Sequence, residues 1–296
     1  MNTHSALQCD QSAIDHCRHI TKREARNFYY GLRLLPEPQR SSLYCIYAWM
    51  RQADDLADDE DGLNDPQSAA RNLDRFRANT HEAISGNLPS KDPMWRAFHA
   101  IVTHYALDKA PFDQMIDGQV ADLEFVQPQT MAQLEDYCRQ VASSVGQVCI
   151  RIWGYDDPSA RTLADQRGLA FQLTNILRDV REDHANGRVY LPMDMLDSCD
   201  IDISSLLEWS DSDRCTLLVR SIVEIAETHY RESAPLDSMI TGSCRPTLQA
   251  MTGIYHGLLR RIDRNPAAIA GTERVRLGSI RKLSIALAAR VKATIQ

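Results

Sequence analysis

The sequence predicts an all-α protein, and three observations support this prediction. Apolar residues recur at spacings of three and four along eight long segments, as they do on one face of a helix. Stretches in which apolar and polar residues alternate, which would indicate strands, are scarce. Only 13 of the 296 residues are glycine, which is below the usual share of about 7%. We expect helices over residues 41–60, 67–86, 93–107, 111–125, 130–152, 159–183, 212–232 and 246–263.

The ends of these segments carry residues that stop or start helices. Proline lacks an amide donor and its ring clashes with the preceding turn, so it stands at helix ends. In chain order, the residues of this kind are Pro36, Pro38, Asp65-Pro66, Pro89, Asp92-Pro93, Pro111, Gln127-Pro128, Asp157-Pro158, Asn186-Gly187 and Pro192. No Gly/Ser-rich linker and no repeat of about 20–50 residues is visible. We therefore expect one domain over residues 1–296.

Charge and composition argue against several classes of protein. The net charge is −7, and we expect no nucleic-acid partner because phosphate contacts need clustered Lys and Arg. No apolar run approaches the roughly 18 residues that a membrane span needs, and the first residues contain no apolar signal-peptide core. The eight cysteines form no C-x-x-C pair, so a structural zinc site is not indicated. We expect a cytoplasmic protein with reduced thiols, in which any membrane contact is peripheral.

An acidic cluster lies at the C-terminal end of the first expected helix, in the segment IYAWMRQADDLADDED. On a helical wheel, a single stripe within about 60° holds Tyr47, Arg51, Asp54 and Asp58. Like charges at this spacing repel by about 0.2–0.5 kcal/mol per pair, and six of the eight residues from 54 to 61 are acidic. A cation would relieve the repulsion, and Mg²⁺ binds carboxylates together with phosphates and water. A solvated acidic helix end is the alternative.

A second polar stripe lies in the segment AFQLTNILRDVREDHANGRVYLP. Again within about 60° of the wheel lie Gln172, Asn175, Asp179 and Asp183. Such a ladder is costly to bury without a partner, and a bound metal would satisfy it. Arg178 and Glu182 stand at i, i+4 spacing, as a pair that could serve only to stabilise the helix. Arg188 follows an Asn-Gly turn, where it could reach a diphosphate or be an ordinary surface arginine.

Two such helices facing each other could hold several Mg²⁺ ions around one diphosphate. The ions would neutralise the leaving group and let an allylic C–O bond break, while the hydrocarbon would occupy an apolar pocket between helices. The motifs of P-loop, dinucleotide-binding, zinc-protease, serine-hydrolase and EF-hand sites are not found. The use of NADPH stays open, because no nucleotide fingerprint is visible.

These motifs resemble those of the squalene/phytoene synthase family, and the resemblance spans nearly the whole chain. The two acidic motifs are Arg51-x-x-Asp54-Asp55-x-x-Asp58 and Asn175-x-x-Arg178-Asp179-x-x-Glu182-Asp183. The other matching segments are Asn27-Phe28-Tyr29-Tyr30 with Leu34-Leu35-Pro36, Tyr137-Cys138-x-x-Val141-Ala142-x-x-Val145-Gly146 and Gly187-Arg188-Val189-Tyr190-Leu191-Pro192. The resemblance implies a single-domain isoprenoid-synthase helical bundle with a central apolar cavity. It also implies a prenyltransferase that joins two prenyl diphosphates head to head (1′–1), with Mg²⁺ or with Mn²⁺ in its place.

The resemblance further implies a role for each matching residue. The metal-binding carboxylates would be Asp54, Asp58, Asp179 and Asp183. The substrate-binding residues would be Asn27, Gln172, Asn175, Arg178, Arg188 and Tyr190. The catalytic residues would be Tyr47, Arg51 and three aromatic residues whose rings can stabilise a carbocation, namely Phe28, Tyr137 and Tyr255. Core packing is the alternative for Phe28 and Tyr255. By helical phase, Asp59, Glu60 and Asp61 lie at or beyond the helix end and are expected to matter less.

Two positions depart from the family pattern. Asn27 stands where serine is expected, and Arg181 stands where glycine is common, on a side of the wheel that points to solvent. The chain ends near Gln296 and is similar to the shorter bacterial members, without the membrane anchor of eukaryotic squalene synthases. We expect two farnesyl diphosphates to give presqualene diphosphate or a C30 product such as squalene. The alternatives are phytoene from geranylgeranyl diphosphate, a one-substrate terpene cyclase, and an inactive helical assembly factor.

Overall fold

The computed structural model describes residues 7–25, 29, 31–58 and 66–295, apart from the side chains of Asp58 and of residues 291–295. These residues form helices and no strand, and one isolated antiparallel bridge pairs Tyr155 with Ile240. The all-α prediction is therefore confirmed for the described part of the chain. None of its helices combines the length and the apolar character that crossing a membrane requires.

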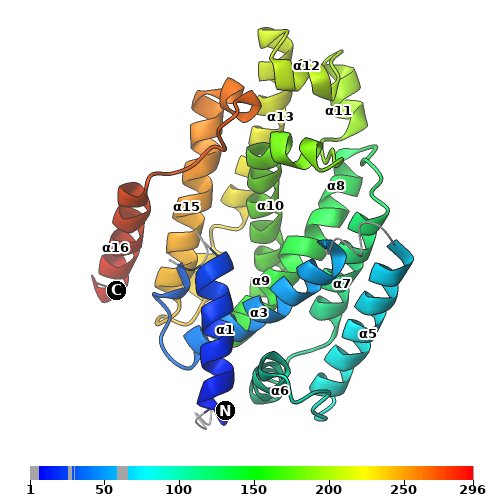
Figure 1. Ribbon diagram of the computed structural model, residues 1–296. Coiled ribbons are helices and arrows are strands. Elements are labelled where there is room, and N and C mark those ends of the chain that lie inside the picture. The colour runs from blue at the N-terminus through cyan, green and yellow to red at the C-terminus, as the bar shows by residue number, and fades with distance from the viewer. Residues whose placement is uncertain (1–6, 26–28, 30, 59–65, 296) are drawn as a thin grey trace.

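The helices follow one another with short connections (Figure 1). The first are α1 (Gln11–Glu24), α3 (Gln39–Asp58), α5 (Pro66–Ile84), α6 (Pro93–Tyr105), α7 (Ala110–Leu123) and α8 (Met131–Cys138). A π-helical turn, η1 (Arg139–Ser143), leads into α9 (Ser144–Trp153) and then α10 (Ala160–Ala185). The remaining elements are α11 (Met193–Ser198), α12 (Ile203–Glu208), α13 (Ser212–Glu232), α14 (Leu236–Met239), α15 (Arg245–Arg264), the 3₁₀ turn η2 (Pro266–Ala270) and α16 (Ser279–Ile295).

The eight expected segments are helical wherever the structure describes them, and the ends of the observed helices lie within two residues of the expected ones. The expectation of one uninterrupted helix over residues 130–152 is wrong, because η1 divides it into α8 and α9. This π turn lies where the chain packs very closely on α10: a Cβ atom on Gly168 would stand 2.6 Å from Ser143 Cα. The Ser143 hydroxyl also donates to the Asp165 carbonyl at 2.8 Å. The structure adds α1, α11, α12, α14 and α16, which the apolar spacing did not indicate.

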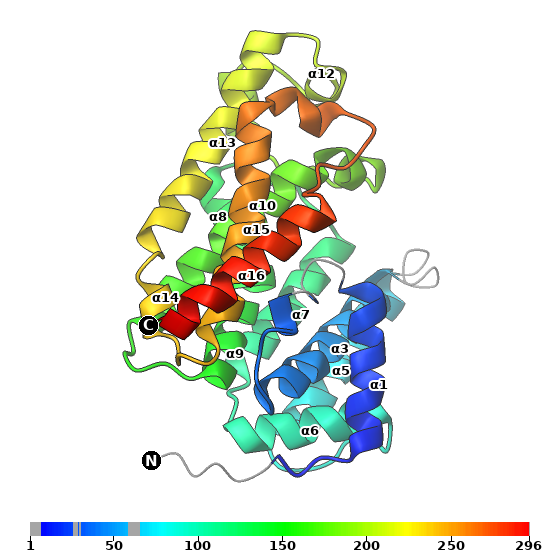
Figure 2. The same cartoon turned by 90° about the vertical axis from the view of Figure 1, so that its left-hand side faces the viewer.

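The long helix α10 lies at the centre of the molecule and packs against α9, α13, α15 and η1 (Figure 1, Figure 2). Two clusters of buried apolar side chains meet on it. Ala160 and Ala164 belong to the cluster formed with α1, α3, α5, α6 and α7, whereas Leu169 and Leu173 belong to the cluster formed with α13 and α15. The organisation as one domain stays a prediction.

Aromatic side chains fill the first of these clusters. The Trp49 ring of α3 is fully buried, and its centroid lies 5.0–5.5 Å from those of Phe76, Phe98 and Phe112. Its indole N–H donates to Thr80 Oγ1 at 3.1 Å, so that the one polar atom of the ring is satisfied. This packing holds α3 against α5, α6 and α7.

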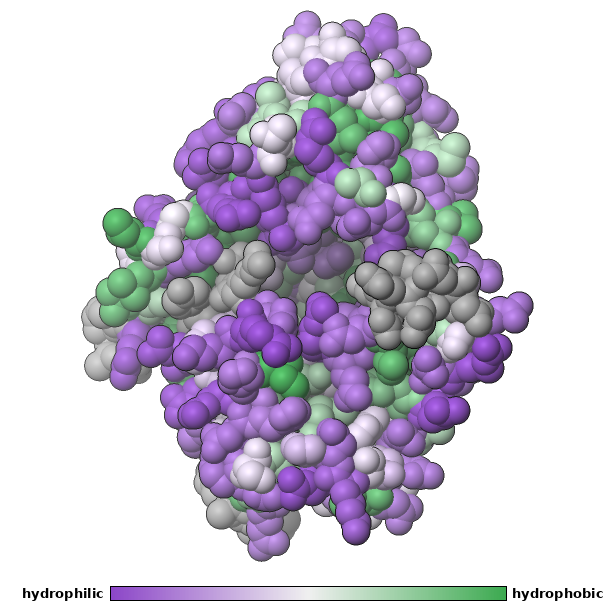
Figure 3. Space-filling model, viewed as in Figure 1, coloured by the Kyte–Doolittle hydropathy of each residue, from purple (hydrophilic) through white to green (hydrophobic). Residues whose placement is uncertain are grey.

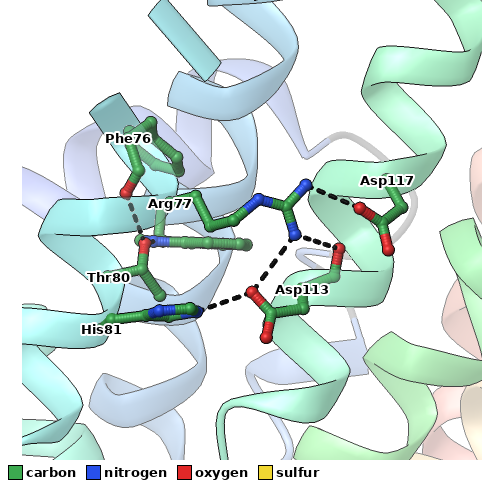
Figure 4. Close-up of polar contacts among 7 residues, drawn as sticks. Phe76, Arg77, Thr80, His81, Asp113 and Asp117 are labelled. Carbon is green, nitrogen blue, oxygen red and sulfur yellow. Dashed lines mark hydrogen bonds and ion pairs between the residues drawn. The ribbon is translucent and has the colours of Figure 1, made fainter. Parts of the chain in front are cut away.

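An ion-pair cluster fixes α5 against α7 (Figure 4). Arg77 of α5 donates to Asp113 Oδ1 at 3.2 Å and to Asp117 Oδ1 at 2.6 Å. His81 Nε2 lies 2.7 Å from the same oxygen of Asp113. The two contacts with Asp113 are partly buried and the one with Asp117 is exposed, and together they hold α7 against α5. The C-terminal turn of α7 borders the site described next.

Candidate functional site

A cavity of about 630 Å³ runs beside α10. Its lining residues on α10 extend from Ala164 to Arg178, which is a rise of about 21 Å at 1.5 Å per residue. The other walls come from α1, α3, η1, α9, α14 and α15 and from residues 274–282. Their apolar members include Val141, Val145, Cys149, Ile150, Trp153, Leu248 and Met251. Figure 3 shows a hollow in the middle of one face of the molecule, bordered by hydrophilic side chains. The volume is in the range of small-molecule sites.

The cavity is polar towards Arg178. The residues expected at the site that line it are Tyr47, Gln172, Asn175, Arg178 and Tyr255. The Asn175 side-chain amide donates to Gln172 Oε1 at 3.3 Å. Asn175 Oδ1 is buried and accepts no hydrogen bond from the described residues. Since a buried acceptor without a donor is costly, this oxygen is suited to a cation or to a donor group of a ligand.

Aromatic rings form part of the same wall. Tyr255 of α15 stacks on Phe171 of α10 with a centroid distance of 4.6 Å and an interplanar angle of 19°. The faces of such rings attract positive charge. Burial, and to a lesser extent the charge of Asp54, raises the pKa of Tyr47 to about 12. The Tyr47 hydroxyl therefore stays protonated at neutral pH and can donate a hydrogen bond.

One carboxylate of α3, that of Asp54, contacts α7. Asp54 Oδ1 accepts a hydrogen bond from Gln119 Nε2 of α7 at 2.7 Å. Arg51 Nη2 lies 2.5 Å from Asp55 Oδ1, one turn further along α3. Asp58 is the last residue of α3. The side chain of Asp58 lies outside the described part of the structure, as do Asn27, Phe28, Asp59, Glu60 and Asp61.

Asp179 is held between two arginines. Its two carboxylate oxygens accept from Arg178 at 2.7 and 2.5 Å and from Arg274 at 2.6 and 2.6 Å. Burial alone would raise the pKa of Asp179, but the two guanidinium groups outweigh burial and lower it. Arg178 and Glu182, which the spacing suggested as an ion pair, have other partners. Arg178 bonds its neighbour Asp179, and Glu182 lies 3.4 Å from Arg274 Nη1. The cause is Arg274, which reaches α10 from a distant part of the chain.

Asp183 lies one turn further along α10. Burial, followed by the charges of Asp179 and Glu182, raises the pKa of Asp183 to about 7, although Arg274 and Arg188 oppose the shift. Asp183 lines a small separate pocket together with Arg188 and Tyr190, beside the main cavity rather than in its wall. Asp183 is therefore less well compensated by the nearby arginines than Asp179 is.

Tyr137 and Tyr190 both hydrogen-bond to a carboxylate that was not predicted from the sequence. Asp122 of α7 accepts from Tyr137 at 2.9 Å and from Tyr190 at 3.0 Å, and the two rings stack 5.0 Å apart. Burial and then the charge of Asp122 raise the pKa of both phenols. Arg188 Nη2 donates weakly to the Asp122 carbonyl at 3.4 Å. The structure thus brings three of the expected residues together around α7.

Sequence reasoning missed several residues that contact the expected site. They are Gln119, Asp122, Arg274 and Lys282. Gln119 and Asp122 form a polar pair at i, i+3 in an expected helix, and that spacing could have indicated them. Arg274 and Lys282 belong to a basic stretch outside the expected helices. Burial, followed by the charges of Arg276 and Arg178, lowers the pKa of Lys282.

Arg181 is not directed to solvent, as its position on the wheel suggested. Its guanidinium donates to the carbonyl of Leu207 at 2.6 Å and to the carbonyl of Ala270. The expectation was wrong because η2 packs on this side of α10 and α12 packs on η2, which a wheel of one helix cannot show. The Arg181 side chain thus donates hydrogen bonds to backbone carbonyls near the C-terminal ends of these two short elements.

The donor chemistry at this end of α10 suits a divalent cation. Among the described side chains, no three His, Cys, Asp or Glu residues converge as a metal-binding group. The oxygen donors at hand are the carboxylates of Asp54, Asp179 and Asp183 and the unpartnered amide oxygen of Asn175. Hard oxygens of this kind are the ligands that Mg²⁺ prefers. Burial and the neighbouring carboxylates raise the pKa of Asp183, so that added positive charge beside it would favour its ionised form.

Comparison with known proteins leads to one family. A sequence model of the family described as squalene/phytoene synthase matches residues 21–281. The phytoene synthase of Mycobacterium tuberculosis is 34% identical over 274 residues, which cover 91% of this chain and 88% of the relative. The presqualene diphosphate synthase of Zymomonas mobilis is 34% identical over 250 residues, which cover 82% of each. A solved structure of a dehydrosqualene synthase in complex with a ligand has a TM-score of 0.85 and 29% identity, and covers 97% of this chain and 98% of that one.

The family match extends over most of the chain and includes both acidic motifs. The likeness of the folds extends over nearly all of it. The chain therefore belongs to the squalene/phytoene synthase family, the all-α prenyltransferases that condense two prenyl diphosphates head to head.

Proposed function

We propose that this enzyme joins two farnesyl diphosphates into presqualene diphosphate or a C30 product formed from it, and that it does so with Mg²⁺. One observation supports this above all others: oxygen donors and arginines gather next to the polar end of a long apolar cavity. A prenyl diphosphate has the same division, with a charged head and an apolar tail. The cavity along α10 offers each part a matching environment.

The head would lie at the C-terminal end of α10. Asp54, Asp58, Asp179 and Asp183 would hold the cation, together with the Asn175 amide oxygen. A bound divalent cation neutralises the diphosphate and so weakens the allylic C–O bond. The protein's own positive charges, at Arg51, Arg178, Arg188 and Arg274, would bind the remaining diphosphate oxygens through charge-assisted hydrogen bonds. Gln172 and the protonated Tyr47 would complete this set with neutral hydrogen bonds.

The tails would lie between α9, α10 and α15. The apolar walls exclude water, which would otherwise trap an allylic cation as an alcohol. The stacked Phe171–Tyr255 pair presents aromatic faces that can stabilise that cation. Tyr137 and Tyr190, fixed by Asp122, would orient groups at the edge of the site. Asn27 and Phe28 keep the substrate-binding and catalytic roles that the resemblance implies.

Chain length is the main alternative within the same reaction. The Mycobacterium tuberculosis relative is named a phytoene synthase, which favours geranylgeranyl diphosphate and phytoene. The Zymomonas mobilis relative is named a presqualene diphosphate synthase, which favours the C15 substrate. A one-substrate cyclase is disfavoured by the two similar acidic motifs, and an inactive assembly factor by carboxylates at all four metal positions. NADPH is not part of the proposal.

We also propose that the enzyme is located in the cytosol and makes peripheral contact with a membrane. Each product named above joins two hydrocarbon chains and keeps at most one diphosphate, so it is more apolar than its substrates, and a lipid phase next to the enzyme would receive it. We expect no nucleic-acid partner, because the chain is acidic overall.

The test is to incubate the purified protein with farnesyl or geranylgeranyl diphosphate, with Mg²⁺ or Mn²⁺, and with or without NADPH. We expect a cyclopropylcarbinyl diphosphate from farnesyl diphosphate without NADPH, detected by mass spectrometry as its alcohol after phosphatase treatment. A faster reaction with geranylgeranyl diphosphate would replace the C15 assignment by the C20 one. A cyclic C15 hydrocarbon as the sole product would show a cyclase instead.

A further inference from the structure

Helix α16 presents an apolar stripe to solvent. Ile280, Leu283 and Leu287 are 87%, 58% and 55% exposed, and their i, i+3, i+7 spacing places them within about 60° on the helix. In the described part of the chain no other helix carries more than one exposed large apolar side chain. Figure 3 shows hydrophobic residues along the edge of the molecule where Figure 1 places α16. Exposed apolar groups gathered in one patch mark an interaction surface.

The opposite face of α16 is already occupied. Ile285 packs so closely on α15 that a Cβ atom on Gly253 would lie 2.7 Å from it, and Ala289 is buried. The helix is therefore apolar on both sides, and its attachment to α15 does not use the exposed stripe. A helix with apolar residues all round is normally covered on both faces.

Basic residues border the stripe. On the helical wheel, Arg290 lies next to Leu283 on one side, and Arg281 lies beyond Ile280 on the other. Both arginines are exposed, and residues 279–290 include no acidic residue, whereas the whole chain has a net charge of −7. A second copy of the chain would bring like charges together if the two stripes paired. An anionic surface with an apolar interior is complementary both to this basic helix and to its exposed apolar stripe.

The position of α16 connects this surface with the cavity. Ser279 and Lys282 of its first turns line the cavity beside α10. In Figure 2, α16 lies across α15. A partner that covers the stripe would therefore lie close to the cavity wall.

We propose that α16 docks the enzyme on an anionic phospholipid membrane, with Ile280, Leu283 and Leu287 inserted among the headgroups. The biological reason for docking rests on the proposed function, because an apolar product needs a lipid phase to enter. The docking itself does not depend on catalysis and is measured without substrate.

The experiment is co-sedimentation of the full chain with vesicles. One set is pure phosphatidylcholine, and the other contains one third phosphatidylglycerol. We expect binding to the anionic vesicles that weakens as salt is raised. The triple variant Ile280→Ser, Leu283→Ser, Leu287→Ser should bind these vesicles at least about tenfold more weakly, because the inserted apolar area is lost. Arg281→Glu with Arg290→Glu should remove the preference for the anionic vesicles.

The matched control is Leu217→Ser on α13, since Leu217 is 58% exposed, as Leu283 is. The control should bind vesicles as the unchanged protein does, and circular dichroism should show equal helix content in all variants. Wild-type protein that stays in solution, or a triple variant that binds like wild type, overturns the proposal. A wild-type dimer in analytical ultracentrifugation that the triple variant abolishes assigns the stripe to a second copy instead. If vesicle binding occurs but no prenyl diphosphate reacts, the proposed function fails and the docking surface stands.

Discussion

At the residue scale, Asp183 is a side chain whose charge depends on what is bound beside it. Its pKa is raised from the usual 3.8 to about 7 by burial and by neighbouring carboxylates. At a pH between these two values, Asp183 of the metal-free protein is therefore still protonated in the folded state but ionised in the unfolded chain. The stability contributed by this group falls as the pH rises through that interval, and remains low above it.

Asp183→Asn is accordingly expected to stabilise the chelator-treated protein at alkaline pH. The gain over wild type should grow with pH and level off above about pH 7, with a rise in Tm of about 2 °C if about 1 kcal/mol is recovered in a chain of this size. Adding Mg²⁺ with inorganic diphosphate should reverse the order, because only the carboxylate gains from the added cation. Thermal melts across the pH series measure both effects. A gain that is the same at every pH would mean that the charge of Asp183 is not the cause.

Trp153, at the end of α9, is the residue for which we predict an effect on substrate length. It is 4% exposed and lines both the main cavity and a second cavity of about 1320 Å³. Its indole Nε1 has no hydrogen-bond partner among the described residues, so that its bulk matters more than its polarity. Trp153→Ala should join the two spaces and raise the ratio of kcat/KM for geranylgeranyl over farnesyl diphosphate by about tenfold.

Trp153→Phe is the matched control, because it keeps a ring in the partition. Its ratio of the two kcat/KM values should stay close to that of wild type. If alanine and phenylalanine give the same ratio as tryptophan, the partition does not limit the length of the chain.

The site residues that could be predicted are those whose positions follow from the periodicity of a single helix. Tyr47 on α3, and Gln172 and Asn175 on α10, follow from a spacing of 3.6 residues per turn, and they do line the cavity. Arg274 could not be found in this way. It lies 95 residues from Asp179 along the chain, and only the packing of the C-terminal segment brings the two together.

At the element scale, the same reasoning separates the expected helices from the missed ones. Helices such as α13 have one buried and one polar face, and their bounds were predicted from that pattern. Helix α16 was missed because its apolar residues face both α15 and solvent, which removes the one-sided pattern. The elements α11, α12 and α14 span too few residues to show a period. The π turn η1 is set by close packing on Gly168 and has no pattern of its own.

The segment between η2 and α16 is predicted to act as part of the diphosphate site. It carries Arg274, which binds Asp179 and Glu182, and it leads to Lys282 in the cavity wall. Arg274→Gln should raise KM for the prenyl diphosphate by about tenfold while lowering kcat less, because a charge that binds the head in both ground state and transition state is removed.

Arg214→Gln on α13 is the control for this prediction, since Arg214 is an arginine of the surface paired with Asp200. It should leave both kinetic constants unchanged. Steady-state kinetics of the two variants decide the matter: equal behaviour of Arg274→Gln and Arg214→Gln would remove this segment from the site.

At the scale of the whole molecule, α10 joins the two hydrophobic clusters and carries half of the acidic site. The other acidic stripe comes from α3, which is fixed in the first cluster by Trp49. The all-α class could be predicted from periodicity and low glycine content, whereas the cavity depends on how the clusters meet along α10. The central claim is that the carboxylates at this junction act by holding divalent cations around a diphosphate.

The most direct test is the rate of product formation from labelled farnesyl diphosphate in excess chelator and after Mg²⁺ is restored. Turnover should vanish with chelator and return with Mg²⁺. Asp179→Asn should lower kcat at least about a hundredfold, or about 2.7 kcal/mol, with an unchanged helical signal in circular dichroism, whereas Asp74→Asn on the exposed side of α5 should not change it. Full turnover in excess chelator, or equal rates for the two variants, would contradict the account.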